Sequence, residues 1–119
     1  AANAFLATKI TFINEIANLC EKTGINVDDI AEGIGTDQRI GSRFLRAGPA
    51  YGGSCFPKDT KALAKTSDDF KVNLSLIKNV IRSNGNRNNL IVQKILKIAK
   101  QNNLKKIGFL GVTFKANTD

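Results

Sequence analysis

Cys55 stands where a glycine-rich loop meets the expected start of a helix. Gly52 and Gly53 precede it and let the backbone approach a ligand closely, because glycine has no Cβ. Pro57 suits the first position of a helix, where its missing N–H would have no partner anyway, and Lys58 would follow in the first turn. A helix N-terminus and a neighbouring lysine both favour the thiolate form of a cysteine. The segment therefore predicts a nucleophilic cysteine suited to covalent catalysis.

The sequence excludes several other kinds of site. The chain holds two cysteines, Cys20 and Cys55, and no histidine. Cysteine–histidine catalysis, serine–histidine–aspartate triads and the usual zinc sites therefore drop out, and we expect no metal. A Cys20–Cys55 disulfide would be unusual in a cytosolic enzyme. Cys20 falls on the apolar face of an expected helix and is interpreted as core, and ordinary burial is also the competing interpretation of Cys55.

The charge of the chain is unevenly distributed. Residues 1–38 hold two lysines and six acids, a balance of −4, whereas residues 39–119 hold sixteen basic and four acidic residues, a balance of +12. A basic segment of this size indicates an anionic partner, and a nucleotide diphosphate is the candidate. The alternative is a solvated basic surface whose acidic neighbours belong to the rest of a larger protein.

Residues 1–23 are predicted to form one helix, which Gly24 would end in the C′ position. Apolar side chains recur along it at helical spacing and cover two flanks: Ala2, Leu6, Ile13, Ile16 and Cys20 on one, and Phe5, Phe12 and Leu19 on the other. An apolar surface this wide predicts burial on two sides, one of them against a second subunit.

The middle of the chain predicts short elements. Asn26 or Asp28 would cap a short helix that runs through Ile34, and residues 36–46 suggest another short helix or a turn. The glycine loop occupies residues 47–55, and a helix then runs from about Lys58 to about Lys65. No internal repeat or low-complexity segment is visible.

The last part of the chain is helical by its apolar spacing from Asn73 to about Asn102, except that the polar run at residues 83–89 reads as a break on propensity alone. Residues 106–110 form a short apolar run before Gly111 and predict a strand. No apolar run reaches the length of a membrane span and no signal peptide is visible. We expect the chain to be cut from a larger protein.

Four ordered motifs carry a resemblance that covers the whole chain. The segment GGSCFPKD at residues 52–59 is similar to the catalytic-cysteine motif of the UDP-glucose/GDP-mannose dehydrogenase family, and its Phe-Pro favours the UDP-glucose 6-dehydrogenases in that family. The segments AANAFLA at residues 1–7, GTDQRIG at residues 35–41 and IGFLGVTFK at residues 107–115 agree with the family in order and spacing.

The resemblance implies a mainly α fold. Residues 1–104 would be the central helical dimerisation and catalytic-cysteine domain, and residues 105–119 would start the C-terminal UDP-binding domain with one β-strand of a truncated α/β unit. It also implies that the region around residues 83–89 belongs to one long helix, continuous or kinked.

The resemblance further implies an oxidoreductase of polysaccharide biosynthesis that converts UDP-glucose to UDP-glucuronate with two NAD. Cys55 would be the nucleophile, passing through a thiohemiacetal and a thioester, Asp59 would orient or deprotonate water, and Asn3 would hold a water or an oxyanion. Cys55, Lys58 and Asp59 would also contact NAD, although the absent N-terminal domain would bind most of it. The family's catalytic lysine would precede Ala1, and Lys9 is interpreted as a surface charge.

Substrate contacts are implied for a larger set. Arg39 matches an arginine that reaches the substrate site of the neighbouring subunit, and Tyr51 would pack on sugar or uracil. The other residues implied to bind substrate are Phe44, Leu45, Arg46, Gly52, Gly53, Phe114 and Lys115. The expected protein is a cytoplasmic homodimer with no nucleic-acid or membrane partner, and the fragment itself would be inactive.

Four alternatives remain open on the sequence, and one of them is a fragment that serves only in assembly. The parent could use GDP-mannose or UDP-N-acetylmannosamine instead of UDP-glucose. A basic helical nucleic-acid-binding module would need lysines on one face with aromatic rings free to stack, but the seven phenylalanines mostly fall on apolar faces. A thiol redox protein would be expected to carry a Cys-x-x-Cys motif, which is absent.

Overall fold

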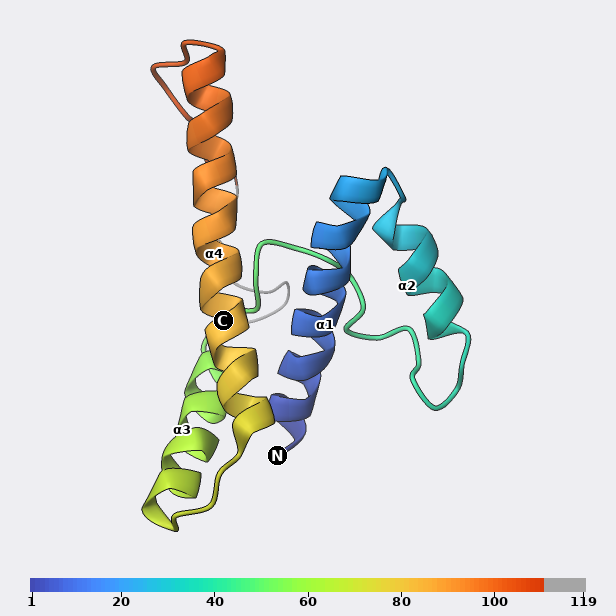
Figure 1. Cartoon of the computed structure of the whole chain (residues 1–119), viewed down its shortest axis with the longest axis vertical. Helices are drawn as coiled ribbons and strands as arrows, with labels where there is room; N and C mark the ends of the chain where they lie inside the picture. The colour runs from blue at the N-terminus through green and yellow to red at the C-terminus, as the bar shows by residue number, and fades with distance from the viewer. Residues whose placement is uncertain (111–119) are drawn as a thin grey trace.

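The computed structural model describes residues 1–110 and confirms a mainly helical fold (Figure 1). The helices of the described residues are α1 (Ala2–Thr23), α2 (Val27–Gly35), α3 (Cys55–Asp69) and α4 (Ser75–Gln101). Helices α1, α3 and α4 pack against one another, whereas α2 contacts α1 alone among the helices. The segment between α2 and α3 runs back across α1 towards α4 before α3 begins (Figure 1).

Helix α1 is built as the sequence predicts. Gly24 ends it with a φ of 74°, and its N–H bonds to the carbonyl of Cys20. One face is buried in the bundle and uses small side chains such as Ala7 and Ala17, which let neighbouring elements approach closely. The flank of Phe5, Phe12 and Leu19 is exposed, at 66%, 49% and 60% of full accessibility. The described residues therefore cover only about half or less of each of these side chains.

The short elements are also close to expectation. Asn26 caps α2, because its Oδ1 accepts a hydrogen bond of 3.0 Å from the Asp28 N–H. Residues 36–46 form turns and not a helix. Helix α3 begins at Cys55, three residues earlier than expected, so Pro57 is its third residue and not its first. Proline fits there because none of the first four N–H groups of a helix has an intrahelical partner.

Helix α4 is continuous through residues 83–89, so the long helix is confirmed and the break is not formed. Asn84 and Arg87 lie three residues apart on the buried face, where they bond to other elements. These tertiary hydrogen bonds oppose the weak helix propensity of the polar run. The C-terminal end of α4 extends beyond α1 and α3 (Figure 1), and Val92, Leu96 and Ile98 in the second half of this helix are more than half exposed.

The core gathers one side chain from each of several elements. Ala7 of α1, Tyr51 of the glycine loop and Val80 of α4 form the buried cluster, against which Ile10 and Phe56 pack. Because Tyr51 belongs to this cluster, the glycine loop is part of the core and not a detached surface segment.

The strand expected at residues 106–110 is not formed. Residues 104–110 are irregular and exposed, and the described part of the chain contains no strand to which they could pair. An isolated strand has no partner for its backbone hydrogen bonds, which explains the difference. None of the helices between residues 1 and 110 combines the length and apolar character that a membrane crossing requires.

Candidate functional site

An open cleft of about 570 Å³ lies between the first turns of α1 and α3. Its lining consists of Asn3 and Leu6 from α1, Phe44 from the segment before the glycine loop, and residues 52–56. The structure thus places Asn3, Cys55 and the two loop glycines around one space. The lining is mostly apolar, and the Cys55 thiol and the Asn3 amide are among its polar groups.

Cys55 is the first residue of α3 and is exposed. Its Sγ lies 3.6 Å from Ser54 Oγ, and Ser54 occupies the N-cap position without a side-chain capping bond. Cys20, in contrast, is only 4% exposed. Both thiols are free, so no disulfide joins them, and the interpretation of Cys20 as a core residue is confirmed. Of the two thiols, Cys55 is the one that can meet a ligand.

Asp59 lies one turn beyond Cys55 on α3 and is linked to α1. Its Oδ2 accepts a hydrogen bond of 2.6 Å from Asn3 Nδ2, and its Oδ1 lies 3.4 Å from Lys58 Nζ. The Asn3 hydrogen bond is the largest cause of the shift and lowers the pKa of Asp59 below its ordinary value. Desolvation comes next and opposes it, and the charge of Lys58 adds a smaller lowering of the pKa. Asp59 is thus held by Asn3, which lines the Cys55 cleft, whereas Asp59 itself does not line it.

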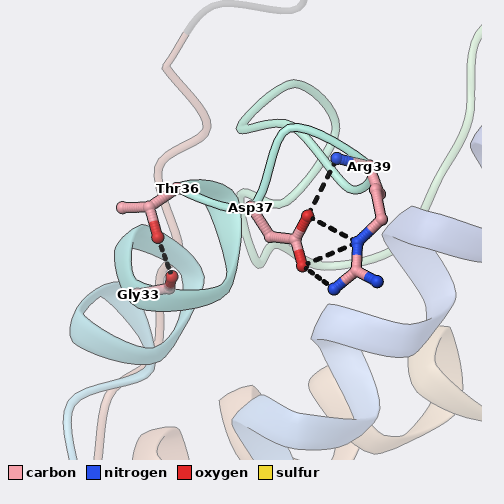
Figure 2. Close-up of polar contacts among 4 residues, drawn as sticks. All are labelled: Gly33, Thr36, Asp37 and Arg39. Carbon is pink, nitrogen blue, oxygen red and sulfur yellow. Dashed lines mark hydrogen bonds and ion pairs between the residues drawn. The ribbon is translucent and has the colours of Figure 1, made fainter.

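Arg39 lies in the turn after α2, and Figure 2 shows its guanidinium facing the Asp37 carboxylate. The Nη2–Oδ2 distance is 2.6 Å, Nε bonds to both carboxylate oxygens, and the Arg39 N–H also bonds to Oδ1. The guanidinium holds the pKa of Asp37 below its ordinary value. The Arg39 side chain is 89% exposed and does not line the Cys55 cleft, so within one chain it faces outwards.

Lys9 of α1 also forms hydrogen bonds with the turn that carries Arg39. Its Nζ donates to the carbonyls of Ile40 and Gly41, at 2.8 and 3.1 Å. Lys9 is thus a charge at the helix surface that also joins α1 to the turn that carries Arg39. On the α2 side of this turn, Thr36 Oγ1 donates to the Gly33 carbonyl at 2.7 Å (Figure 2).

The remaining substrate-binding candidates divide into three groups. Phe44 lines the cleft, has a φ of 65° that is costly for a non-glycine residue, and sets its ring edge-on to Phe56. Leu45 is buried and Arg46 is exposed, and neither lines the cleft. The expectation that the Tyr51 ring packs on sugar or uracil is wrong for this fold, because that ring is 6% exposed within the core. Phe114 and Lys115 lie outside the described residues.

The residues that hold the glycine loop in place were not predicted from the sequence. Asn14 accepts from the Gly48 N–H at 2.8 Å, Arg87 Nε donates to the Gly48 carbonyl at 3.1 Å, and the Asn84 amide bonds to both backbone groups of Tyr51. The available signal was the three-residue spacing of Asn84 and Arg87 within an otherwise apolar helix face. Among residues 1–110, no cluster of three or more acidic or cysteine side chains has the arrangement of a metal site.

Residues 1–86 match the model of the UDP-glucose/GDP-mannose dehydrogenase family, central domain. The chain belongs to this family. The family assignment agrees with the motifs at residues 1–7, 35–41 and 52–59, all of which fall within the matched range.

Relatives in the UDP-glucose/GDP-mannose dehydrogenase family include curated proteins named UDP-glucose 6-dehydrogenase. The chain is 57% identical to one from Rhizobium meliloti (strain 1021) and 51% identical to one from Bacillus subtilis (strain 168), and each alignment covers 100% of the chain. These alignments cover only 28% and 27% of the two relatives. A solved UDP-glucose dehydrogenase from Pyrobaculum islandicum superposes with a TM-score of 0.73 at 33% identity, covering 86% of the chain and 23% of that structure.

Proposed function

We propose that this chain is the central part of an NAD-dependent UDP-glucose 6-dehydrogenase, which converts UDP-glucose to UDP-glucuronate. The observation that carries the proposal is the cleft in which Asn3, the loop glycines and an exposed Cys55 meet. The names of the relatives in Rhizobium meliloti and Bacillus subtilis favour UDP-glucose over GDP-mannose or UDP-N-acetylmannosamine. Residues 105–119 would begin the UDP-binding domain that follows.

Cys55 is proposed to carry the covalent chemistry. NAD, when bound, accepts the hydride that leaves C6 in each of two oxidations. After the first oxidation the Cys55 thiolate attacks the aldehyde carbon and a C–S bond forms while the C=O π bond breaks. The oxygen takes up a proton and becomes the hydroxyl of a thiohemiacetal, and this proton is released again in the second oxidation. The second oxidation converts this adduct to a thioester. Water then adds to the thioester carbon, the C–S bond breaks, and the carboxylate product and the thiolate separate.

Asn3 and Asp59 are proposed to prepare the water for that last step. The Asp59 carboxylate accepts a hydrogen bond from water and sets its direction, while the Asn3 amide holds the carboxylate at 2.6 Å and also faces the cleft. A carboxylate whose pKa is lowered is a weak base, so orientation and not proton removal is its main contribution.

The exposed first turn of α3 fits an anionic dinucleotide. Lys58 is 74% exposed and adds a positive charge to the N–H groups of that turn, a donor set that suits phosphate oxygens. Cys55, Lys58 and Asp59 would hold NAD from this side, and a nucleotide-binding domain outside this chain would hold the rest of it. The chain by itself is therefore expected to have no dehydrogenase activity.

The parent protein is proposed to work as a homodimer. The exposed flank of α1, formed by Phe5, Phe12 and Leu19, supports a second copy as its cover. The outward direction of Arg39 also suits a contact with the substrate of a neighbouring subunit, since a guanidinium fork recognises anionic oxygens.

The activity is tested on the full-length protein that contains this chain. Purified enzyme is mixed with NAD and, in parallel, with UDP-glucose, GDP-mannose or UDP-N-acetylmannosamine, and NADH and uronate are both quantified. The proposal expects UDP-glucuronate with two NADH for each product molecule. Oxidation of a mannose substrate alone would transfer the proposal to another member of the family, and one NADH for each product would remove the thioester.

A further inference from the structure

The glycine loop is held by side chains and not by backbone pairing. Within the described residues, no hydrogen bond joins a backbone group of residues 42–53 to another backbone group. Instead, the N–H and carbonyl of Gly48 bond to Asn14 and Arg87, and the N–H and carbonyl of Tyr51 bond to Asn84 at 2.8 and 3.0 Å. The position of the loop therefore depends on three side chains from α1 and α4.

These three side chains are buried. Asn14, Asn84 and Arg87 are 2%, 9% and 8% exposed. Arg87 makes no ion pair with a carboxylate among the described residues, and its guanidinium instead donates to the carbonyls of Gly48 and Asn14 and to the Asn18 side chain. Burying a guanidinium and two amides costs free energy that apolar residues of similar size would not cost. The presence of this buried polar network, despite its cost, is explained if it holds the loop in a single conformation.

The Asn84 contact lies next to the cleft. The residues that follow Tyr51 are Gly52, Gly53, Ser54 and Cys55, and these four line the cleft. The Asn84 side chain bonds to Tyr51 as the backbone of a neighbouring strand would, because one amide satisfies both the N–H donor and the carbonyl acceptor of Tyr51. Any movement of Tyr51 would therefore move the wall of the cleft and the residue that leads into Cys55.

We infer that Asn84 and Arg87 are positioning residues that hold the glycine loop in its ligand-binding shape. They act through the backbones of Tyr51 and Gly48 and do not line the Cys55 cleft. The functional part of this inference rests on the proposed oxidation of UDP-glucose. Loss of the Asn84 contact should then weaken substrate binding more than it slows the chemical steps, because Cys55 and Asp59 lie on α3, which the substitution leaves intact.

The experiment compares Asn84→Ala with Asn88→Ala in the full-length protein. Asn88 is the matched control, since it has the same side chain one turn further along α4 but is exposed. Hydrogen exchange measured by mass spectrometry on peptides covering residues 46–54 should become about tenfold faster in Asn84→Ala, with no change in Asn88→Ala. The KM for UDP-glucose should rise about tenfold while kcat changes less than threefold, again only in Asn84→Ala.

The exchange measurement needs no substrate, so it separates this inference from the proposed function. If the wild-type protein does not oxidise UDP-glucose but Asn84→Ala still accelerates exchange in the loop, the proposed function fails and the loop contact stands. A wild-type Tyr51 amide that exchanges as fast as an unprotected one overturns the inference even if no variant folds. Unchanged loop exchange in a folded Asn84→Ala protein overturns it, as does a fall in kcat at constant KM.

Discussion

The side-chain amide of Asn3 on α1 donates a hydrogen bond of 2.6 Å to the carboxylate of Asp59 on α3, across 56 positions of sequence. This contact ties together the two helix ends between which the Cys55 cleft opens. It also gives Asp59 its lowered pKa and fixes the direction of its oxygens. Two residues that family resemblance implicates separately in catalysis thus act on one another directly.

Replacing Asn3 by alanine should raise the pKa of Asp59 towards its ordinary value, because the Asn3 hydrogen bond is the largest cause of the shift. A lowered pKa stabilises the fold above the ordinary aspartate pKa, and this stabilisation is lost as the pH falls through the folded-state value. Asn3→Ala should therefore be less stable than wild type at neutral pH, and the difference should shrink in acid. Carboxyl NMR titration measures the pKa, with Asn88→Ala as control. An unchanged Asp59 titration would contradict the assignment.

Cys55 should be alkylated faster than Cys20 in the folded protein, since Cys55 is exposed and Cys20 is 4% exposed. A brief treatment with iodoacetamide followed by peptide mass spectrometry measures both sites in one sample. We expect at least about a tenfold difference in rate, which unfolding in urea should abolish. Equal labelling of the two thiols under native conditions would argue against the structure around Cys55.

The features that could be predicted from the sequence are those that depend on residues close together in the chain. The ends of α1 and α2 follow from Gly24 and Asn26, because a cap is specified by residues that are neighbours in sequence. The continuity of α4 through its polar run depends on contacts with the glycine loop, which propensity alone does not contain. The burial of Tyr51 was missed for the same reason.

In the full-length protein, Cys55→Ser should lower the overall rate of uronate formation on the order of a hundredfold or more, while UDP-glucose affinity changes little. Serine is a much weaker nucleophile at neutral pH, and the oxygen ester that replaces the thioester would hydrolyse slowly. Single-turnover kinetics should show that the second oxidation or the hydrolysis is blocked. A Cys55→Ser enzyme with a near wild-type rate would remove the nucleophile from the mechanism.

Arg39→Ala should mainly raise KM, and it offers a test of the dimer when combined with Cys55→Ser. If Arg39 serves the neighbouring subunit, a mixed dimer of the two variants has one complete site. At UDP-glucose concentrations far below the raised KM, neither homodimer turns over appreciably, so the activity of the mixed dimer is measured. Random mixing of equal amounts should then restore about a quarter of the wild-type activity. Arg43→Ala is the matched control, because Arg43 is also exposed and follows the same turn.

Two results would contradict this arrangement. A mixture that stays inactive after subunit exchange would place Arg39 at the site of its own chain or outside any site. Light scattering that shows a folded monomer at micromolar concentration would remove the partner altogether, and with it the explanation for the exposed flank of Phe5, Phe12 and Leu19.

Tyr51 is the only tyrosine of the chain, which also lacks tryptophan. Its phenol is therefore the one side chain here that gives useful intrinsic fluorescence, and it lies edge-on to Phe56 within the core. Emission from this ring reports on the junction of the glycine loop with α1 and α4. This intrinsic fluorophore stands four residues before Cys55, at a buried position where a bulky engineered label would disturb the packing.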